Sequence, residues 1–302
     1  MVATNLPPEF EHRREDYDLI TGVPGYVDDI APAEDRPALL VMMVVRSPYP
    51  NARIKAINLE KARALPGVIA ALSGEEAVGH LKTMDTMPVP GLIKPDRRPL
   101  AIGQARYVGD PVAVVLAEDR YIALDARDLV EVEYEPLESV TDPEEALKKG
   151  APLVYPEFGT NRAFDHPSNG GDIKAAFEEA DRVVRLRLVN QRITASSIEP
   201  RACMFDYNDG TGELTGWMSS QSIFRAQDVL AGFLGLDKAR IKIRNALVGG
   251  AFGAKNAFVG EEITLAALAY RYQRPIKCWK AAPKICSPRP THAVRSIISR
   301  RQ

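Results

Sequence analysis

Apolar and polar residues along the chain predict strands that alternate with helices. An uninterrupted apolar run of strand length, such as 39–45, is typical of a strand that is buried on both faces. In the first half of the chain we predict strands at 39–45, 68–72, 112–117 and 130–134. Helices are predicted at 59–65, 120–129 and 142–149, and the last of these is expected to be capped by Asp142.

A segment rich in Pro, Gly, Asn and Ser, 151–171, is the best candidate for a linker between two units. After it, helices are predicted at 172–180, 223–234 and 260–270. Strands are predicted at 184–188, 204–207, 214–217 and 241–248, with a hairpin turn at 208–210. The pattern as a whole predicts a mixed α+β chain of two units.

Composition excludes several classes of partner. With 39 Lys and Arg against 40 Asp and Glu, the net charge is −1, so no overall field attracts nucleic acid or an anionic membrane surface. The longest apolar run is far shorter than the roughly 18 residues of a membrane span. Residues 1–16 carry no apolar signal-peptide core, and a cytoplasmic location is expected. The three cysteines, Cys203, Cys278 and Cys286, lack the paired spacing of a disulfide framework, zinc site or iron–sulfur cluster.

A glycine-rich turn is the first candidate site. Residues 249–253 lie between a predicted strand and a predicted helix, where glycines let the backbone approach a ligand and amides can point at an anion. The turn lacks the signature of a P-loop and the spacing of a dinucleotide-binding loop. Taken alone, this pattern fits an ordinary turn better than a ligand site.

Three other features have simple structural interpretations. Glu199 beside Arg201 could be a general base, but a surface ion pair is the simpler interpretation. Ser219 and Ser220 are expected to cap the helix that follows them. The four histidines are scattered without metal-binding spacing, so no metal held directly by protein side chains is expected.

Several motifs gain meaning because they occur together and in order. They resemble the large, molybdenum-binding subunit of the xanthine dehydrogenase, aldehyde oxidase and carbon monoxide dehydrogenase family, over residues 15–277. The matching segments are GYVDDI at 25–30, RSPYPNARI at 46–54, ALPGV at 64–68, VGDPVA at 108–113, VEYEPL at 132–137, IEPR at 198–201, SSQ at 219–221 and VGGAFGAK at 248–255.

The resemblance implies an α/β hammerhead domain at 15–150, followed at 165–277 by the first part of a molybdopterin-binding domain. Members of this family hydroxylate an electron-poor carbon of a small-molecule substrate at a molybdenum centre. The cofactor implied is molybdenum-molybdopterin in its cytosine dinucleotide form. The partners implied are an iron–sulfur small subunit and an FAD-binding medium subunit, which carry the electrons away.

Matching positions imply roles for individual residues. Gln221 would hydrogen-bond the apical oxygen ligand of molybdenum, and the backbone of Gly249, Gly250, Ala251, Phe252 and Gly253 would hold the metal's oxygen ligands or the pterin. Phe252 would also line the pocket. The family's catalytic glutamate lies beyond the matching part, so no catalytic residue is assigned. Purine-oxidising members carry an acid where this chain has Asn256, which argues against xanthine as substrate.

The last 25 residues, 278–302, differ from the rest of the chain. From Lys277 to Gln302, seven residues are basic and none is acidic. Relatives continue here with an acidic segment. Codons that encode residues 278–287 can also encode such a segment when they are read two bases later. We therefore expect a frameshifted tail, although a basic tail for an acidic partner is the alternative.

These observations predict a molybdenum hydroxylase large subunit. We expect that the 302 residues do not catalyse the reaction alone. We also expect the second unit to expose apolar surface. One alternative is a non-catalytic hammerhead module that binds iron–sulfur or flavin subunits. A nicotinamide enzyme that uses the turn at 249–253 is a third hypothesis.

Overall fold

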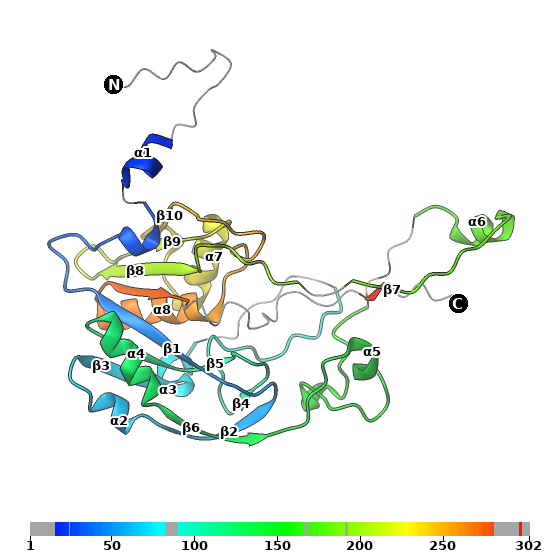
Figure 1. Ribbon diagram of the computed structural model, residues 1–302, viewed down its shortest axis with the longest axis horizontal. Helices are drawn as coiled ribbons and strands as arrows, with labels where there is room; N and C mark the ends of the chain where they lie inside the picture. The colour runs from blue at the N-terminus through cyan, green and yellow to red at the C-terminus, as the bar shows by residue number, and fades with distance from the viewer. Residues whose placement is uncertain are drawn as a thin grey trace, which may run out of the picture.

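A seven-stranded sheet forms the centre of the protein in this computed structural model (Figure 1). The structure describes residues 16–23, 25–81, 90–165, 167, 170–190 and 193–280, and the backbone of 296–297. The strand order is β10-β9-β8-β11-β1-β5-β3. In chain order these strands are β1 (Leu40–Arg46), β3 (Val68–Ser73), β5 (Pro111–Ala117), β8 (Ala202–Asn208), β9 (Glu213–Met218), β10 (Ile241–Asn245) and β11 (Ile276–Trp279).

Two smaller sheets accompany the central one. A three-stranded sheet has the order β4-β2-β6, and β7 pairs with β12. Their bounds are β2 (Ala52–Asn58), β4 (Gln104–Ala105), β6 (Glu131–Pro136), β7 (Leu188–Val189) and β12 (Ser296–Ile297). The α-helices are α1 (Asp16–Thr21), α2 (Glu60–Arg63), α3 (Gly74–Val78), α4 (Arg120–Asp128), α5 (Pro143–Ala146), α6 (Ile173–Glu179), α7 (Ile223–Leu234) and α8 (Gly260–Tyr272). This helix and strand content confirms the predicted α+β class.

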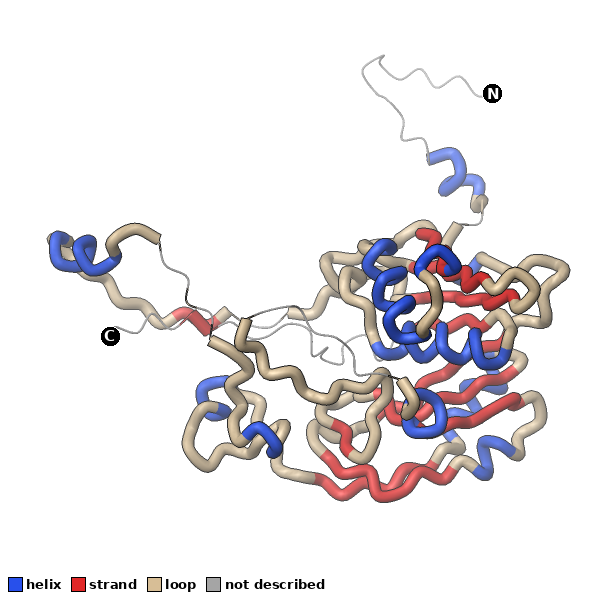
Figure 2. The backbone as a smooth tube through the Cα atoms, turned by 180° about the vertical axis from the view of Figure 1, so that it is seen from behind, coloured by secondary structure: helices blue, strands red, loops and turns tan. Residues whose placement is uncertain are grey.

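The apolar run at β1 is explained by helices on both faces of the sheet. Leu40 and Met42 belong to a core cluster with α8, whereas Val41 and Met43 pack with Ala123 of α4 on the opposite face. Figure 2 shows α7 and α8 in front of the strands, on the side away from the viewer of Figure 1. Because successive side chains of a strand point to opposite faces, a strand covered on both faces needs apolar residues at every position.

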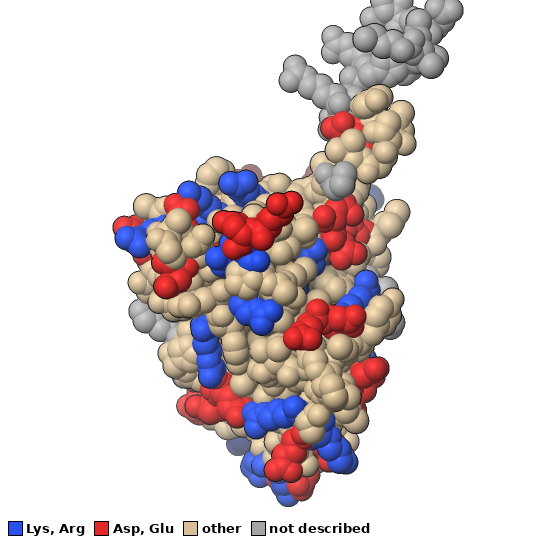
Figure 3. All heavy atoms as spheres, turned by 90° about the vertical axis from the view of Figure 1, so that its left-hand side faces the viewer, with Lys and Arg blue, Asp and Glu red and all other residues tan. Residues whose placement is uncertain are grey.

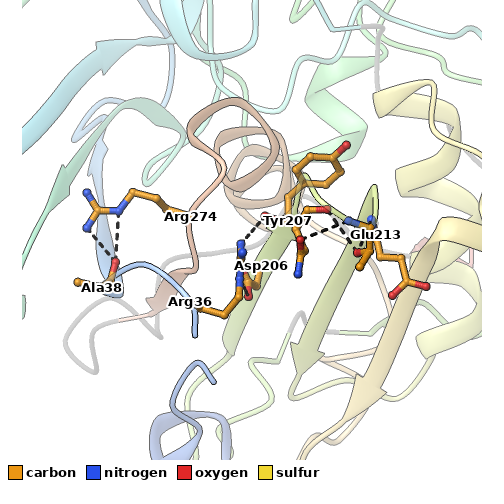
Figure 4. A network of polar contacts seen from close by, with 8 residues as sticks. Arg36, Ala38, Asp206, Tyr207, Glu213 and Arg274 are labelled. Carbon is orange, nitrogen blue, oxygen red and sulfur yellow. Dashed lines mark hydrogen bonds and ion pairs between the residues drawn. The ribbon is translucent and has the colours of Figure 1, made fainter. Parts of the chain in front are cut away.

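One sheet and one core join the two halves of the chain. β11 runs parallel to β1, with Leu40 opposite Ile276, so no sheet boundary separates residues before 150 from those after 165. Side chains reinforce this contact (Figure 4): Arg36 donates to Asp206 at 2.8 Å, and Arg274 donates to the carbonyl of Ala38 at 2.9 Å. The two halves of the chain thus share one sheet. The domain bounds drawn from the sequence stay predictions.

Predicted and observed elements differ most at 184–188. The alternating residues predict a strand there, but the chain forms only the two-residue strand β7, and Val184 and Leu186 are 88% and 71% exposed. A strand needs a neighbour for its hydrogen bonds, and this segment leads out to α6, away from the sheet (Figures 1 and 2). The expected exposed apolar surface on the second unit is found in this segment. The helix capped by Asp142 is also shorter than predicted, because it ends at Ala146.

The residues that follow Lys277 include part of the sheet. Cys278 and Trp279 complete β11 and lie opposite Cys203 and Ala202 of β8. The first two residues of the expected tail are thus in register with the fold. The remainder of the tail lies outside the described residues, apart from Lys280 and the two residues of β12.

Candidate functional site

The glycine-rich turn joins β10 to α8 and has an unusual backbone. Gly250, Phe252 and Gly253 have φ angles of 95°, 50° and 80°, in the left-handed region that favours glycine. Among the described residues, none accepts a hydrogen bond from the amides of Gly250, Ala251, Phe252 or Gly253. Consecutive amides with no acceptor are the kind of backbone that binds an anion, so the turn can receive oxygen atoms of a ligand.

Glu199 lies beneath this turn. Its Oε2 accepts hydrogen bonds from the amide of Gly249 at 2.7 Å, from the hydroxyl of Ser219 at 2.8 Å and from Nζ of Lys255 at 2.6 Å. The side chain of Lys255 is 1% exposed and that of Glu199 is 14% exposed. The interpretation of Glu199 and Arg201 as a surface ion pair is therefore wrong, because each is largely buried and pairs with a different residue.

Arg201 forms its ion pair with Glu262 in the first turn of α8. Its Nη2 also donates to the carbonyl of Ala254, directly after the turn, at 2.5 Å. Burial lowers the pKa of Arg201, but the nearby carboxylate of Glu262 outweighs this effect, and the net change is upward. The guanidinium is thus a permanent cation that ties the end of the turn to α8.

Gln221 lies at the far end of the same turn. Its backbone amide donates to the carbonyl of Lys255 at 3.1 Å, and its Oε1 accepts from the amide of Lys255 at 3.2 Å. Gln221 is exposed, and no described residue accepts from its Nε2. The structure thus brings Gln221 and the turn 249–253 together, although about thirty residues separate them in the chain.

The neighbouring serines do not cap α7 as expected. Ser222 is the residue at the N-cap, and Ser219 bonds to Glu199. Ser220 instead donates from its hydroxyl to the carbonyl of Lys255 at 3.4 Å. The two serines are buried beside the turn, where hydroxyls can satisfy polar groups that water does not reach. Sequence reasoning missed the contacts of Ser219 and Lys255 with Glu199, because no local pattern connects these residues.

Phe252 stands at the crest of the turn and is 77% exposed. A cavity of about 610 Å³ lies elsewhere, lined by residues such as Arg46, Asp110 and Lys280, and no residue of 249–253 lines it. The role of Phe252 as a pocket wall therefore stays a prediction. Within the described ranges, no group of three or more His, Cys, Asp or Glu side chains could hold a metal ion.

Comparisons with known proteins cover both halves of the chain. Residues 21–138 match the aldehyde oxidase and xanthine dehydrogenase a/b hammerhead domain, and residues 154–283 match the molybdopterin cofactor-binding domain. The structure of quinoline 2-oxidoreductase from Pseudomonas putida 86 superimposes with a TM-score of 0.82 at 31% identity, over 90% of this chain and 34% of that chain.

The chain belongs to the molybdenum hydroxylase family. Members with similar sequences include the 6-hydroxypseudooxynicotine dehydrogenase complex subunit gamma of Paenarthrobacter nicotinovorans, which is 33% identical over 88% of this chain and 33% of its own length. The carbon monoxide dehydrogenase large chain of Hydrogenophaga pseudoflava is 31% identical over 87% of this chain and 34% of its own. The chain thus spans about a third of the length of these molybdenum hydroxylase subunits, which are parts of multi-subunit complexes. In the part of the chain that is described, no helix is long and apolar enough to cross a membrane.

Proposed function

We propose that this chain contributes to the large subunit of a molybdenum hydroxylase and holds one side of its molybdopterin cofactor. The observation that carries the proposal is the row of four adjacent amides, Gly250 to Gly253, which have no acceptor among the described residues. They are followed closely by Lys255, whose amide donates to Oε1 of Gln221 at 3.2 Å. Such a set of neutral donors fits a cofactor whose outer atoms are oxygens. Fixed dipoles aimed at negative charge need no reorganisation when that charge develops.

The residues of this chain would share the work as follows. The amides of the turn bind and orient oxygen atoms of the cofactor, and Nε2 of Gln221 donates to a further oxygen. Glu199, Lys255 and Ser219 lie below and hold the turn in place. Phe252 offers an exposed aromatic face beside the donors, suited to a planar substrate. When bound, the cofactor supplies the two-electron oxidation of a small molecule.

The finer parts of the proposal follow from the family resemblance of the motifs. We propose the cytosine dinucleotide form of the cofactor, and an iron–sulfur small subunit and an FAD-binding medium subunit as partners. The face of the protein in Figure 3 carries acidic and basic side chains that are interspersed, so charge of one sign does not select a partner there. The similarity to complete large subunits favours this function over a non-catalytic hammerhead module.

Metal analysis tests the proposal. The chain is produced in a host that makes the cofactor, and molybdenum and pterin are measured in the purified protein. We expect both to be present and to fall at least fivefold in Gly250→Ala, whose φ of 95° an L-residue rarely adopts, and in Gln221→Leu. The control is Gly232→Ala in α7, where nothing lies within 4 Å of the added carbon.

Absence of molybdenum from the unaltered protein, or equal contents in all four proteins, would overturn the proposal. Subunit binding without molybdenum would support the module instead.

A further inference from the structure

One carboxylate oxygen connects both ends of the turn. Oε2 of Glu199 accepts from the amide of Gly249, where the turn begins, and from Nζ of Lys255, two residues after the turn ends. The backbone amide of Glu199 also donates to the carbonyl of Gly249 at 3.1 Å. Glu199 is thus bonded to both polar backbone atoms of Gly249 and to the side chain of Lys255, and the residues between them form a closed loop above it.

The contact between Glu199 and Gly249 leaves no room for a side chain. A carbon added at Gly249 would lie 2.6 Å from Cβ of Glu199. A glycine is therefore required here because the backbone of the turn presses against Glu199, and this close approach is independent of the hydrogen bonds.

Lys255 transmits the same restraint to Gln221. The backbone of Lys255 exchanges two hydrogen bonds with Gln221, and one of them uses Oε1 of the side chain. Because the amide oxygen is occupied by Lys255, the nitrogen Nε2 is the part of the Gln221 side chain that remains for a ligand. The position of Lys255 therefore decides which atom Gln221 presents.

The ion pair also controls charge below the turn. A buried carboxylate without a partner would repel an anionic ligand, whereas Lys255 offsets its charge at 2.6 Å. The donors above then act on a ligand without an opposing charge beneath them.

We infer that Glu199 is a positioning residue of the cofactor site, which holds the amides of 250–253 and Nε2 of Gln221 in one arrangement. The ligand in this inference rests on the proposed function, but the arrangement itself can be tested without the cofactor. The substitution Glu199→Gln keeps the size of the side chain and removes the charge that pairs with Lys255. The matched control is Glu135→Gln, which removes an exposed carboxylate paired with Arg53 at 2.8 Å, away from the turn.

The first measurement is amide hydrogen exchange in the full chain, followed by NMR. We expect the amides of Gly249 and Lys255 to exchange at least tenfold faster in Glu199→Gln than in the unaltered chain or the control, while amides of β8 and β9 stay unchanged. Exchange within twofold at both amides would overturn the inference. If the single variant does not fold, the double variant Glu199→Gln with Lys255→Met removes both charges and is measured in the same way.

The second measurement uses molybdate as a tetrahedral oxoanion probe of the donors. We expect its titration to shift the amide signals of 250–253 and the Nε2 signal of Gln221, with an apparent Kd at least fivefold weaker in Glu199→Gln. Equal affinity in both folded proteins would contradict a positioning role. That result is expected of a residue that only stabilises the fold. Absence of any shift in the unaltered chain would count against the proposed function, whereas the exchange experiment would still decide the role of Glu199.

Discussion

Arg201 and Glu262 form an ion pair in which the side chains are 5% and 2% exposed. Glu262 also accepts from the amide of Val259 at 3.0 Å, so the same carboxylate caps α8 and neutralises the arginine beside β8. Both charged groups are buried away from water, and such a pair is stable as long as both partners are present.

Removal of one partner of this pair is expected to be severe. Glu262→Gln removes the carboxylate that is hydrogen-bonded to the buried guanidinium of Arg201, and we expect the free energy of unfolding to fall by about 3–5 kcal/mol. Urea unfolding measures this change. Replacement of both residues, Arg201→Met with Glu262→Leu, is expected to restore most of the loss. A similar loss in the single and double variants would contradict this interpretation.

The close approach at Gly249 predicts a second effect. Gly249→Ala forces the turn away from Glu199, because the new carbon would lie 2.6 Å from Cβ of Glu199. We expect the free energy of unfolding to fall by about 1–3 kcal/mol, the usual range for overpacking. Gly232→Ala in α7 serves as the comparison, since the added carbon meets nothing and is expected to stabilise the helix by about 0.5–1 kcal/mol. Thermal unfolding of both variants shows whether the free energy of unfolding falls or rises in each. A stabilised Gly249→Ala would refute the steric argument.

Phe252 carries backbone strain that a glycine would relieve. Its φ of 50° is unfavourable for an aromatic residue, and its side chain is 77% exposed and buries little apolar area. We expect Phe252→Gly to raise the free energy of unfolding by about 1 kcal/mol. Phe252→Ala keeps the β-carbon and is expected to give no such gain. If the alanine variant is stabilised as much as the glycine variant, the strain lies elsewhere.

Asp110 predicts a dependence of stability on pH. Burial raises the pKa of this carboxyl group to about 6 from 3.8, against the opposing hydrogen bond from the amide of Arg106. The folded state therefore binds the proton more tightly than the unfolded state. Its contribution to stability is present below pH 3.8 and is lost as the pH rises through about 6.

The substitution Asp110→Asn resembles the protonated carboxyl at every pH and isolates this contribution. Relative to the variant, the unaltered protein is expected to lose about 3 kcal/mol of stability as the pH rises through this window, from a shift of about two pKa units. Urea unfolding at several pH values measures the difference. Parallel curves for the two proteins would show that the carboxyl ionises normally in the fold.

Local patterns in the sequence predicted much of the fold. The apolar run of β1, the helix α7 with its stop at Gly235, and the hairpin of β8 and β9 are confirmed nearly to the residue. These elements follow from side-chain periodicity and from turn residues, which act over a few neighbours in the chain. The segment 184–188 shows the limit of that reasoning, because an alternating pattern forms a strand only where a neighbouring strand supplies hydrogen bonds.

The candidate site divides in the same way. Local sequence was enough to identify the glycines of the turn and, through the motifs, the family and Gln221. Tertiary structure alone decided that Glu199 bonds to Lys255 rather than to Arg201, and that β11 joins the second half of the chain to β1. Pairings of this kind link residues tens or hundreds of positions apart, so they depend on the path of the whole backbone. Residue type and charge can be read directly from the sequence, but the partner of each charged group depends on which distant segments the fold brings together.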